Sequence, residues 1–151
     1  AISGPTTTTL YEVGTTKHIE LDNGGNRHYI SVDGGMSDNI RTGLYGAEYT
    51  AILANRTSNE SEIASRIVGK HCETGDIVIR DLQFPSDVKP GDLIATPATG
   101  AYGRSMANNY NHVPKPAVIA VADGKARLIL RRETISDLLA LDVAEPGREL
   151  K

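Results

Sequence analysis

The segment GKHCETGD, residues 69–76, holds the only cysteine of the 151-residue chain, Cys72, directly before the carboxylate of Glu73. A thiol can deliver a proton to a reacting atom, and an adjacent carboxylate can bind an ammonium group. The Thr-Gly-Asp sequence that follows is typical of a turn, so we predict that both residues lie at the tip of a β-hairpin. The alternative is that Cys72 is a small buried side chain and Glu73 a solvated one.

A second candidate site lies in VDGGMSDNIRTGLYG, residues 32–46, where Arg41 and Tyr45 are four positions apart. The polar residues at its start are good N-caps and predict one or two helical turns over residues 37–45. On a helix this spacing places both side chains on one face. A guanidinium beside a phenol suits a carboxylate ligand. The alternative is an exposed arginine whose stem packs against a tyrosine.

The third candidate is Tyr102, which lies between small residues in TGAYG, residues 99–103. Glycines on either side let a ligand approach the backbone closely, so Tyr102 can contact a bound molecule. The alternative is a core aromatic residue, in a chain that is only 5% aromatic. The EPGR segment at residues 145–148, by contrast, is predicted to be a solvated stretch without function.

Short β-branched and aromatic runs separated by Gly and Pro predict a mainly β fold. We predict strands over residues 6–13, 17–21, 28–32, 49–54, 62–70, 76–81, 92–95, 117–122 and 126–132. A further helix is predicted over residues 134–141, with Thr134 as N-cap and Asp137 completing a capping box. Mostly antiparallel strands at this spacing are typical of a Greek-key-like β-barrel or sandwich, here with two or three short helices.

The composition argues against several classes of protein. A net charge of −3 without runs of Lys or Arg argues against a nucleic-acid partner, and the apolar stretches are too short to span a membrane. The four histidines are scattered without paired ligand spacing, so no metal site is predicted. A single cysteine cannot form an internal disulfide, which fits a cytoplasmic location.

Taken in order, these segments resemble the C-terminal domain of the diaminopimelate decarboxylases, pyridoxal 5'-phosphate enzymes of the alanine racemase-like fold (fold type III). The matching motifs are VDGGMSDNIRTGLYGAEY, GKHCETGD, PGDLIATPATGAYGRSMANNYN and KPAV, closed by RRET and DLLALD. The resemblance runs from about residue 4 to residue 142. It implies that residues 1–142 form the C-terminal β-domain, that residues 1–16 link it to a preceding barrel, and that residues 143–151 are a frayed polar tail.

The resemblance also implies a role for each candidate residue. Cys72 corresponds to the catalytic proton donor, and Glu73 to the residue that binds the distal ammonium group of the substrate. Arg41 and Tyr45 correspond to residues that bind its distal carboxylate, and Tyr102 to a residue that contacts both substrate and cofactor. The cofactor, pyridoxal 5'-phosphate, is bound in the family mainly by an N-terminal (β/α)8 barrel, which also carries the Schiff-base lysine.

The reaction implied is the decarboxylation of meso-2,6-diaminopimelate to L-lysine and CO2, the last step of lysine biosynthesis. The family forms head-to-tail homodimers whose active sites lie between the barrel of one subunit and the β-domain of the other, with the Cys-Glu pair entering the partner's site. The 151-residue chain by itself is expected to be inactive. Two alternatives stay open: a sister decarboxylase acting on ornithine, arginine or a polyamine precursor, and a β-barrel binding module without catalysis.

Overall fold

The computed structural model describes residues 2, 4–100 and 102–143, and most of the regular structure in this part of the chain is β-strand. In chain order the elements are β1 (Thr8–Glu20), β2 (Asn26–Val32), α1 (Arg41–Tyr45), β3 (Ile52–Leu53), β4 (Glu62–Val68), β5 (Ile77–Pro85), β6 (Leu93–Pro97), α2 (Gly103–Met106), the 3-10 helix η1 (Tyr110–His112), β7 (Val118–Ala122), β8 (Lys125–Leu130) and α3 (Ile135–Leu138). The predicted fold class, mainly β with short helices, is therefore confirmed.

The tail predicted over residues 143–151, with EPGR at 145–148, lies outside the described residues from residue 144 on. No helix within the described ranges is long and apolar enough to cross a membrane.

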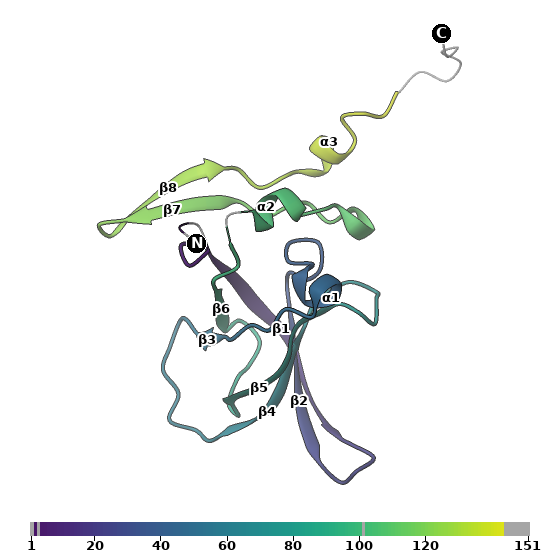
Figure 1. The fold of residues 1–151 in the computed structure, drawn as a ribbon, viewed down its shortest axis with the longest axis vertical. Helices are drawn as coiled ribbons and strands as arrows, with labels where there is room; N and C mark the ends of the chain where they lie inside the picture. Colours follow the sequence, from purple (N-terminus) through teal and green to yellow (C-terminus); the bar gives the residue numbers. More distant parts are fainter. Residues whose placement is uncertain (1, 3, 101, 144–151) are drawn as a thin grey trace.

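Six strands form one mixed sheet in the order β3-β6-β1-β2-β4-β5, and β7 and β8 form a separate antiparallel pair. Figure 1 shows the larger sheet curled into a half-barrel, with the β7–β8 pair lying across one end of it. Neighbouring strands of the larger sheet are antiparallel except β2 and β4, which are parallel. The long connection between β2 and β4 permits this arrangement, because a parallel pair needs a crossover of a dozen or more residues.

β1 is one continuous strand, so the prediction of two strands over residues 6–13 and 17–21 is wrong. Its N-terminal part pairs with β6, and the part from Val13 onward pairs with β2. The register shifts between Val13 and Thr16, which marks a bulge around Gly14. A bulge with a glycine bends a strand without ending it. β1 therefore belongs to both halves of the sheet and joins them.

The other elements follow the predictions in type but differ in several places. β5 extends to Pro85, beyond the strand predicted over residues 76–81, α3 covers only Ile135–Leu138 of the helix predicted over residues 134–141, and η1 is not among the predictions. The strand predicted over residues 49–54 is reduced to β3, because only Ile52 and Leu53 pair with β6. Helix α2 is absent from the sequence-based predictions, since it is a single turn without a side-chain cap and carries no capping signal. The predicted capping box is confirmed: Asp137 N donates to Thr134 Oγ1 (3.3 Å), and Thr134 N donates to Asp137 Oδ2 (2.7 Å).

The hydrophobic core draws mainly on β1, β2, β4, β5 and β6. Its side chains are each at most 5% exposed: Tyr11, Val13, Ile30, Val32, Ile67, Val78, Ile79, Phe84, Val88 and Ile94. Burying an aliphatic or aromatic side chain of this size stabilises the fold by about 1.5–3 kcal/mol. Helix α1 is attached to the core strands, because buried Thr42 donates through Oγ1 to the backbone oxygen of Val78 (2.8 Å). The place of α1 on the sheet is therefore set by β5.

The carboxylate of Asp76 joins the loop after β2 to the loop between β4 and β5. It is 3% exposed. Its Oδ1 accepts a hydrogen bond from Met36 N (2.6 Å), and its Oδ2 accepts from His71 N (2.7 Å) and His71 Nδ1 (2.8 Å). Gly35 and Gly69 pack directly against the carboxylate, and a Cβ on either would overlap its oxygen atoms. The two loops are thereby held together at this end of the sheet.

We expect Gly69→Ala to destabilise the chain, because its Cβ has to displace the buried carboxylate of Asp76. Gly75→Ala in the same loop is the matched control, since no heavy atom beyond its chain neighbours lies within 4 Å of the position of its Cβ. Urea unfolding should show a loss of about 1–3 kcal/mol for Gly69→Ala and a change within about 0.5 kcal/mol for Gly75→Ala. Equal free energies of unfolding for the two variants would show that the loop can accommodate a Cβ beside Asp76 without loss of stability.

His18 on β1 and His28 on β2 are cross-strand partners, and their rings stack with centroids 4.1 Å apart. His28 is 1% exposed, and neither of its ring nitrogens has a hydrogen-bond partner among the described residues. Burial lowers the pKa of His28, and the proximity of His18 lowers it further. A proton on this ring would be buried without an acceptor, so the folded state favours the neutral form.

The stability of the fold should therefore decrease on acidification. The unfolded chain binds a proton at His28 below its ordinary pKa of 6.5, whereas the folded chain binds it only at a lower pH, so the free energy of unfolding decreases as the pH falls below that value. One proton contributes a slope of at most about 1.4 kcal/mol per pH unit. Urea unfolding between about pH 8 and pH 5 should show a shallower dependence for His28→Leu than for the parent chain. His112→Asn, at an exposed histidine, is the control that should keep the parent slope, and three identical slopes would contradict the assignment.

Candidate functional site

Helix α1 carries two of the predicted site residues, Arg41 at its first position and Tyr45 at its last. The predicted helical turn is confirmed, although it begins at residue 41 and not at residue 37. Tyr45 is 63% exposed. Arg41 is partly buried, and its Nη1 donates a hydrogen bond to the hydroxyl of Tyr49 (2.9 Å). Gly46 ends the helix in the left-handed conformation. Arg41 and Tyr45 are therefore the first and last residues of a five-residue helix.

The ring of Tyr102 lies beside the guanidinium of Arg41. Arg41 Cζ is 5.2 Å from the centroid of this ring and 5.8 Å from that of Tyr49, both within the range of cation–π contacts. Tyr102 immediately precedes α2 and is 50% exposed, so the alternative of a core aromatic residue is wrong. The alternative for Arg41, an exposed residue whose stem packs against a tyrosine, does not hold as stated, because Arg41 is partly buried and contacts Tyr49 and Tyr102 through its guanidinium.

The guanidinium of Arg41 retains unused hydrogen-bonding capacity. Its Nε is buried without a hydrogen-bond partner in the described part of the chain, and a buried unpaired donor costs free energy. A carboxylate can accept two parallel hydrogen bonds from a guanidinium, so it is a ligand of suitable chemistry for Arg41. With the two tyrosine rings holding the guanidinium, Arg41 and Tyr102 form a polar and aromatic surface that suits an anionic ligand.

Cys72 and Glu73 lie in the loop that connects the antiparallel strands β4 and β5, so the predicted hairpin tip is confirmed. Glu73 N donates to His71 O (2.8 Å), which closes a three-residue turn with Cys72 at its centre. Cys72 is a free, exposed thiol, and the alternative of a small buried side chain is therefore wrong. The turn presents the thiol to the surroundings of the chain.

The carboxylate of Glu73 is exposed and is surrounded by hydrogen-bond donors. Its Oε1 accepts from Gly75 N (3.5 Å) and Thr74 Oγ1 (3.3 Å), and its Oε2 accepts from the hydroxyl of Tyr110 (3.4 Å). The backbone hydrogen bond from Gly75, followed by the hydroxyl of Thr74, lowers the pKa of Glu73 below its ordinary value. Glu73 is therefore ionised at neutral pH, as a residue that binds an ammonium group must be.

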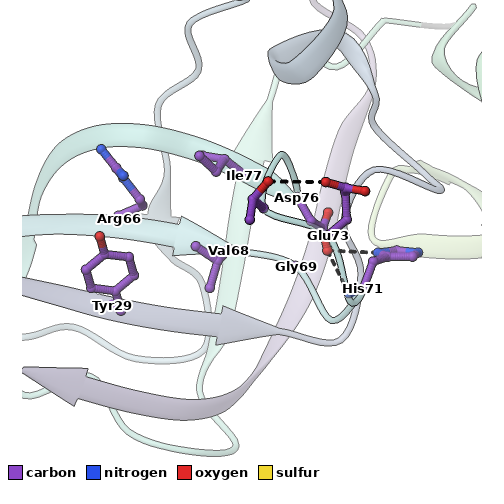
Figure 2. A pocket seen from close by; sticks show the side chains of 9 residues that line it. Tyr29, Arg66, Val68, Gly69, His71, Glu73, Asp76 and Ile77 are labelled. Atoms are coloured by element: carbon purple, nitrogen blue, oxygen red, sulfur yellow. Dashed lines mark hydrogen bonds and ion pairs between the residues drawn. The ribbon is translucent and has the colours of Figure 1, made fainter.

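A cavity of about 340 Å³ lies beside the hairpin tip. Figure 2 shows Tyr29 and Arg66 at one end of it and His71 and Glu73 at the other. Arg66 is already engaged, because its Nη2 donates to Asp81 Oδ1 (3.3 Å) and its guanidinium lies over the ring of Tyr29 (5.7 Å from Cζ to the centroid). Two carboxylates line the cavity. Asp76 is buried and bonded to His71, whereas Glu73 is exposed and can receive a cation.

The structure divides the five predicted site residues into two groups. Arg41, Tyr45 and Tyr102 lie around helix α1, while Cys72 and Glu73 lie on the hairpin tip. Within residues 2, 4–100 and 102–143, no hydrogen bond, ion pair or ring contact connects one group to the other. The two groups are nevertheless neighbours in the fold, because Gly43 of α1 lies beside the hairpin loop, where a Cβ on it would be 3.6 Å from Gly75 O.

Several residues that shape the site are absent from the sequence-based candidates. Tyr49 holds Arg41, and Tyr110 contacts both Glu73 and His71, whose ring centroid is 5.9 Å from its own. His71 and Asp76 flank the Cys-Glu pair within the same segment, so their pairing could have been suspected from the sequence. Tyr49 and Tyr110 lie within two of the matching motifs, but their contacts with Arg41 and Glu73 form only when distant loops fold together.

The chain has relatives among characterised families. Residues 5–100 match the family model described as pyridoxal-dependent decarboxylase, C-terminal sheet domain. The chain is 57% identical over 143 residues to a diaminopimelate decarboxylase of Mycobacterium bovis and 49% identical over 143 residues to one of Bacillus subtilis. Each match covers 95% of this chain but only 32% and 31% of the relative, so the chain spans about a third of the length of these proteins.

Solved structures agree with these relatives. AQ1208 from Aquifex aeolicus superposes with a TM-score of 0.85 at 32% identity, over 94% of this chain and 34% of the other. The diaminopimelate decarboxylase from M. jannaschii, solved in co-complex with L-lysine, superposes with a TM-score of 0.82 at 33% identity, over 95% of this chain and 31% of the other. The family match covers more than half of the residues and agrees with the observed half-barrel. The chain therefore belongs to the family of C-terminal sheet domains of pyridoxal-dependent decarboxylases.

Proposed function

We propose that this chain is the C-terminal domain of a diaminopimelate decarboxylase, which converts meso-2,6-diaminopimelate into L-lysine and CO2. The observation that carries the proposal is the 57% identity with a diaminopimelate decarboxylase along 95% of the chain, a stretch that includes the three candidate motifs. The chemistry of the two groups supports it. A substrate with both a carboxylate and an ammonium group at its far end requires a cation and an anion, and Arg41 and Glu73 are such a pair.

The geometry of each group supports the substrate-binding role proposed for it. Arg41 has an unpaired donor and an aromatic frame, and the exposed phenol of Tyr45 lies on the same helix, so these two residues bind the distal carboxylate. Glu73, whose pKa is lowered by the Gly75 amide and Thr74, binds the distal ammonium group as a carboxylate. Charged pairs of this kind bring direction as well as affinity to recognition.

Cys72 supplies the proton in the proposed reaction. The bond between the α-carbon and its carboxylate breaks, CO2 leaves, and a proton from Cys72 Sγ adds to the α-carbon. Pyridoxal 5'-phosphate, when bound, provides the electron sink that makes this bond cleavage possible. In this chain the half-exposed ring of Tyr102 is available to contact both the cofactor and the substrate, and its position against Arg41 fits such a role.

We propose further that the active site is assembled from two subunits, which fits the lack of any direct contact between the two groups among the described residues. In the proposed head-to-tail homodimer, Tyr102, Arg41 and Tyr45 serve one site, and Cys72 and Glu73 enter the partner's site. The N-terminal barrel of the same protein, with the Schiff-base lysine, completes each site. Exposed apolar side chains on the β7–β8 pair, with Val121 at 74% exposed, support the presence of further protein structure against this ribbon. A cytoplasmic location, where thiols stay reduced, is part of the same proposal.

The proposed substrate can be tested with the full-length protein that contains this chain. It should release CO2 and form L-lysine from meso-diaminopimelate, while L-lysine and L-ornithine, which lack the distal carboxylate, should react about 10⁴-fold more slowly in kcat/KM, because they leave Arg41 unpaired. Mass spectrometry of the products measures both rates. Faster turnover of ornithine would identify a sister decarboxylase, and no turnover of any amino acid would favour a binding module.

The two residues of the hairpin tip should affect different kinetic constants in the full-length protein. Cys72→Ala should lower kcat by about 10²–10⁴-fold with little change in KM, because only proton transfer is lost. Glu73→Gln should raise KM for diaminopimelate by about 10- to 100-fold, since a hydrogen bond to a charged group is worth about 1.5–3 kcal/mol. Steady-state kinetics with cofactor loading measured by absorbance separates the cases. An unchanged kcat in fully loaded Cys72→Ala would remove the thiol from the reaction.

A further inference from the structure

Behind the exposed Cys-Glu pair lies a buried pair of polar side chains, the imidazole of His71 and the carboxylate of Asp76. Their side chains are 0% and 2% exposed, and His71 Nδ1 is 2.8 Å from Asp76 Oδ2. Figure 2 shows both in the hairpin loop, with the dashed contact between them. Neither belongs to the set of residues proposed to contact the substrate. Their position directly beside the proposed proton donor calls for a physical explanation.

The hydrogen bonds around Asp76 define the orientation of the imidazole. The carboxylate accepts from the backbone amides of Met36 (2.6 Å) and His71 (2.7 Å) as well as from the ring. Because a carboxylate only accepts hydrogen bonds, the shared proton is on Nδ1 of His71. The opposite nitrogen, Nε2, is buried without a partner among the described residues, and the ring of Tyr110 lies 5.9 Å away between centroids. The ring is therefore oriented by its hydrogen bond from Nδ1 to Asp76 and by its burial.

The same residue controls the course of the backbone through the tip. The amide of His71 is bound to Asp76, while its carbonyl oxygen accepts from Glu73 N (2.8 Å). Asp76 N donates in turn to Glu73 O (3.1 Å), which closes the next turn. Cys72 lies between these bonded residues. These bonds fix the course of the backbone on either side of Cys72, and the imidazole helps to hold the carboxylate of Asp76 that accepts one of them.

A buried polar pair is an inefficient source of stability, because apolar side chains of similar volume often stabilise as much or more. What such a pair does supply is a directional constraint, and here it acts on the segment that carries the proposed chemistry. Gly35 and Gly69 leave room for the carboxylate and for nothing larger, so the pocket is shaped around it. The pair is therefore better explained by the geometry it imposes than by the stability it adds.

We propose that His71 and Asp76 are positioning residues, which hold the thiol of Cys72 where it can protonate the α-carbon and hold Glu73 beside it. The chemical part of this proposal rests on the function proposed above. The pair itself makes no contact with substrate. Its effect on kcat acts through Cys72 and should therefore appear only while Cys72 is present, whereas its effect on Glu73 should appear in KM.

A double-mutant cycle in the full-length enzyme tests this dependence. His71→Ala should lower kcat at least about tenfold with KM for diaminopimelate changed less, whereas His71→Asn should retain most of the rate, because its Nδ2 can replace Nδ1 as donor to Asp76. In the Cys72→Ala background, His71→Ala should cause no further loss of kcat, since coupled residues are not additive. The proposal would be overturned if the fold-losses of kcat in His71→Ala and Cys72→Ala multiplied in the double variant. It would also be overturned if His71→Asn did not retain most of the rate.

Amide hydrogen exchange followed by mass spectrometry tests the positioning without relying on activity. In the full-length protein, peptides covering residues 69–77 should exchange at least about tenfold faster in His71→Ala and Asp76→Asn than in the parent or in His71→Asn, because local opening becomes easier. Asp22→Asn makes the same chemical change at an exposed turn and is the matched control. Unchanged exchange in the first two variants would overturn the positioning role. If His71→Ala and Asp76→Asn exchange faster but the parent protein does not turn over diaminopimelate, the positioning role is upheld and the proposed function is refuted.

Discussion

A buried carboxylate loses its hydrogen bonds to water. Around Asp76, three N–H groups from two loops donate hydrogen bonds in place of that water. One of these donors, Met36 N, is 40 residues away in the sequence. The exchange is favourable only while all three donors stay in place, because a buried charge deprived of a partner costs several kcal/mol. The loop after β2 and the hairpin between β4 and β5 are therefore interdependent, and with them the places of helix α1 and of the Cys-Glu pair.

A second acidic side chain extends this network to β1. Asp38 Oδ1 accepts from Gly35 N (2.7 Å), and its Oδ2 accepts from the hydroxyl of Tyr11 (2.5 Å). Burial raises the pKa of Asp38. Burial also raises the pKa of Tyr11, and the negative charge of Asp38 raises it further. The loop between β2 and α1 is thus bonded on one side to the hairpin and on the other to the central strand. Its two glycines allow this close packing, since a Cβ on Gly34 would overlap the ring of Tyr11.

Local patterns in the sequence were sufficient for much of the fold and for the choice of candidate residues. The hairpin around Cys72, the helical turn that carries Arg41 and Tyr45, and the capping box of α3 all depend on neighbours within a few positions. The predictions were wrong where distant partners decide. β1 continues through Gly14 because β6 and β2 pair with its successive parts, and neither partner is visible locally. The contacts of Tyr49 and Tyr110 with the site were inaccessible for the same reason.

The continuity of β1 has a mechanical consequence. Tyr102 follows β6, which pairs with the first part of β1, and the hairpin with Cys72 extends from β4, which pairs with β2 and through it with the second part. β1 therefore transmits any bending of one half of the sheet to the other half. Gly14, where the register shifts, is the position at which the two halves bend relative to one another.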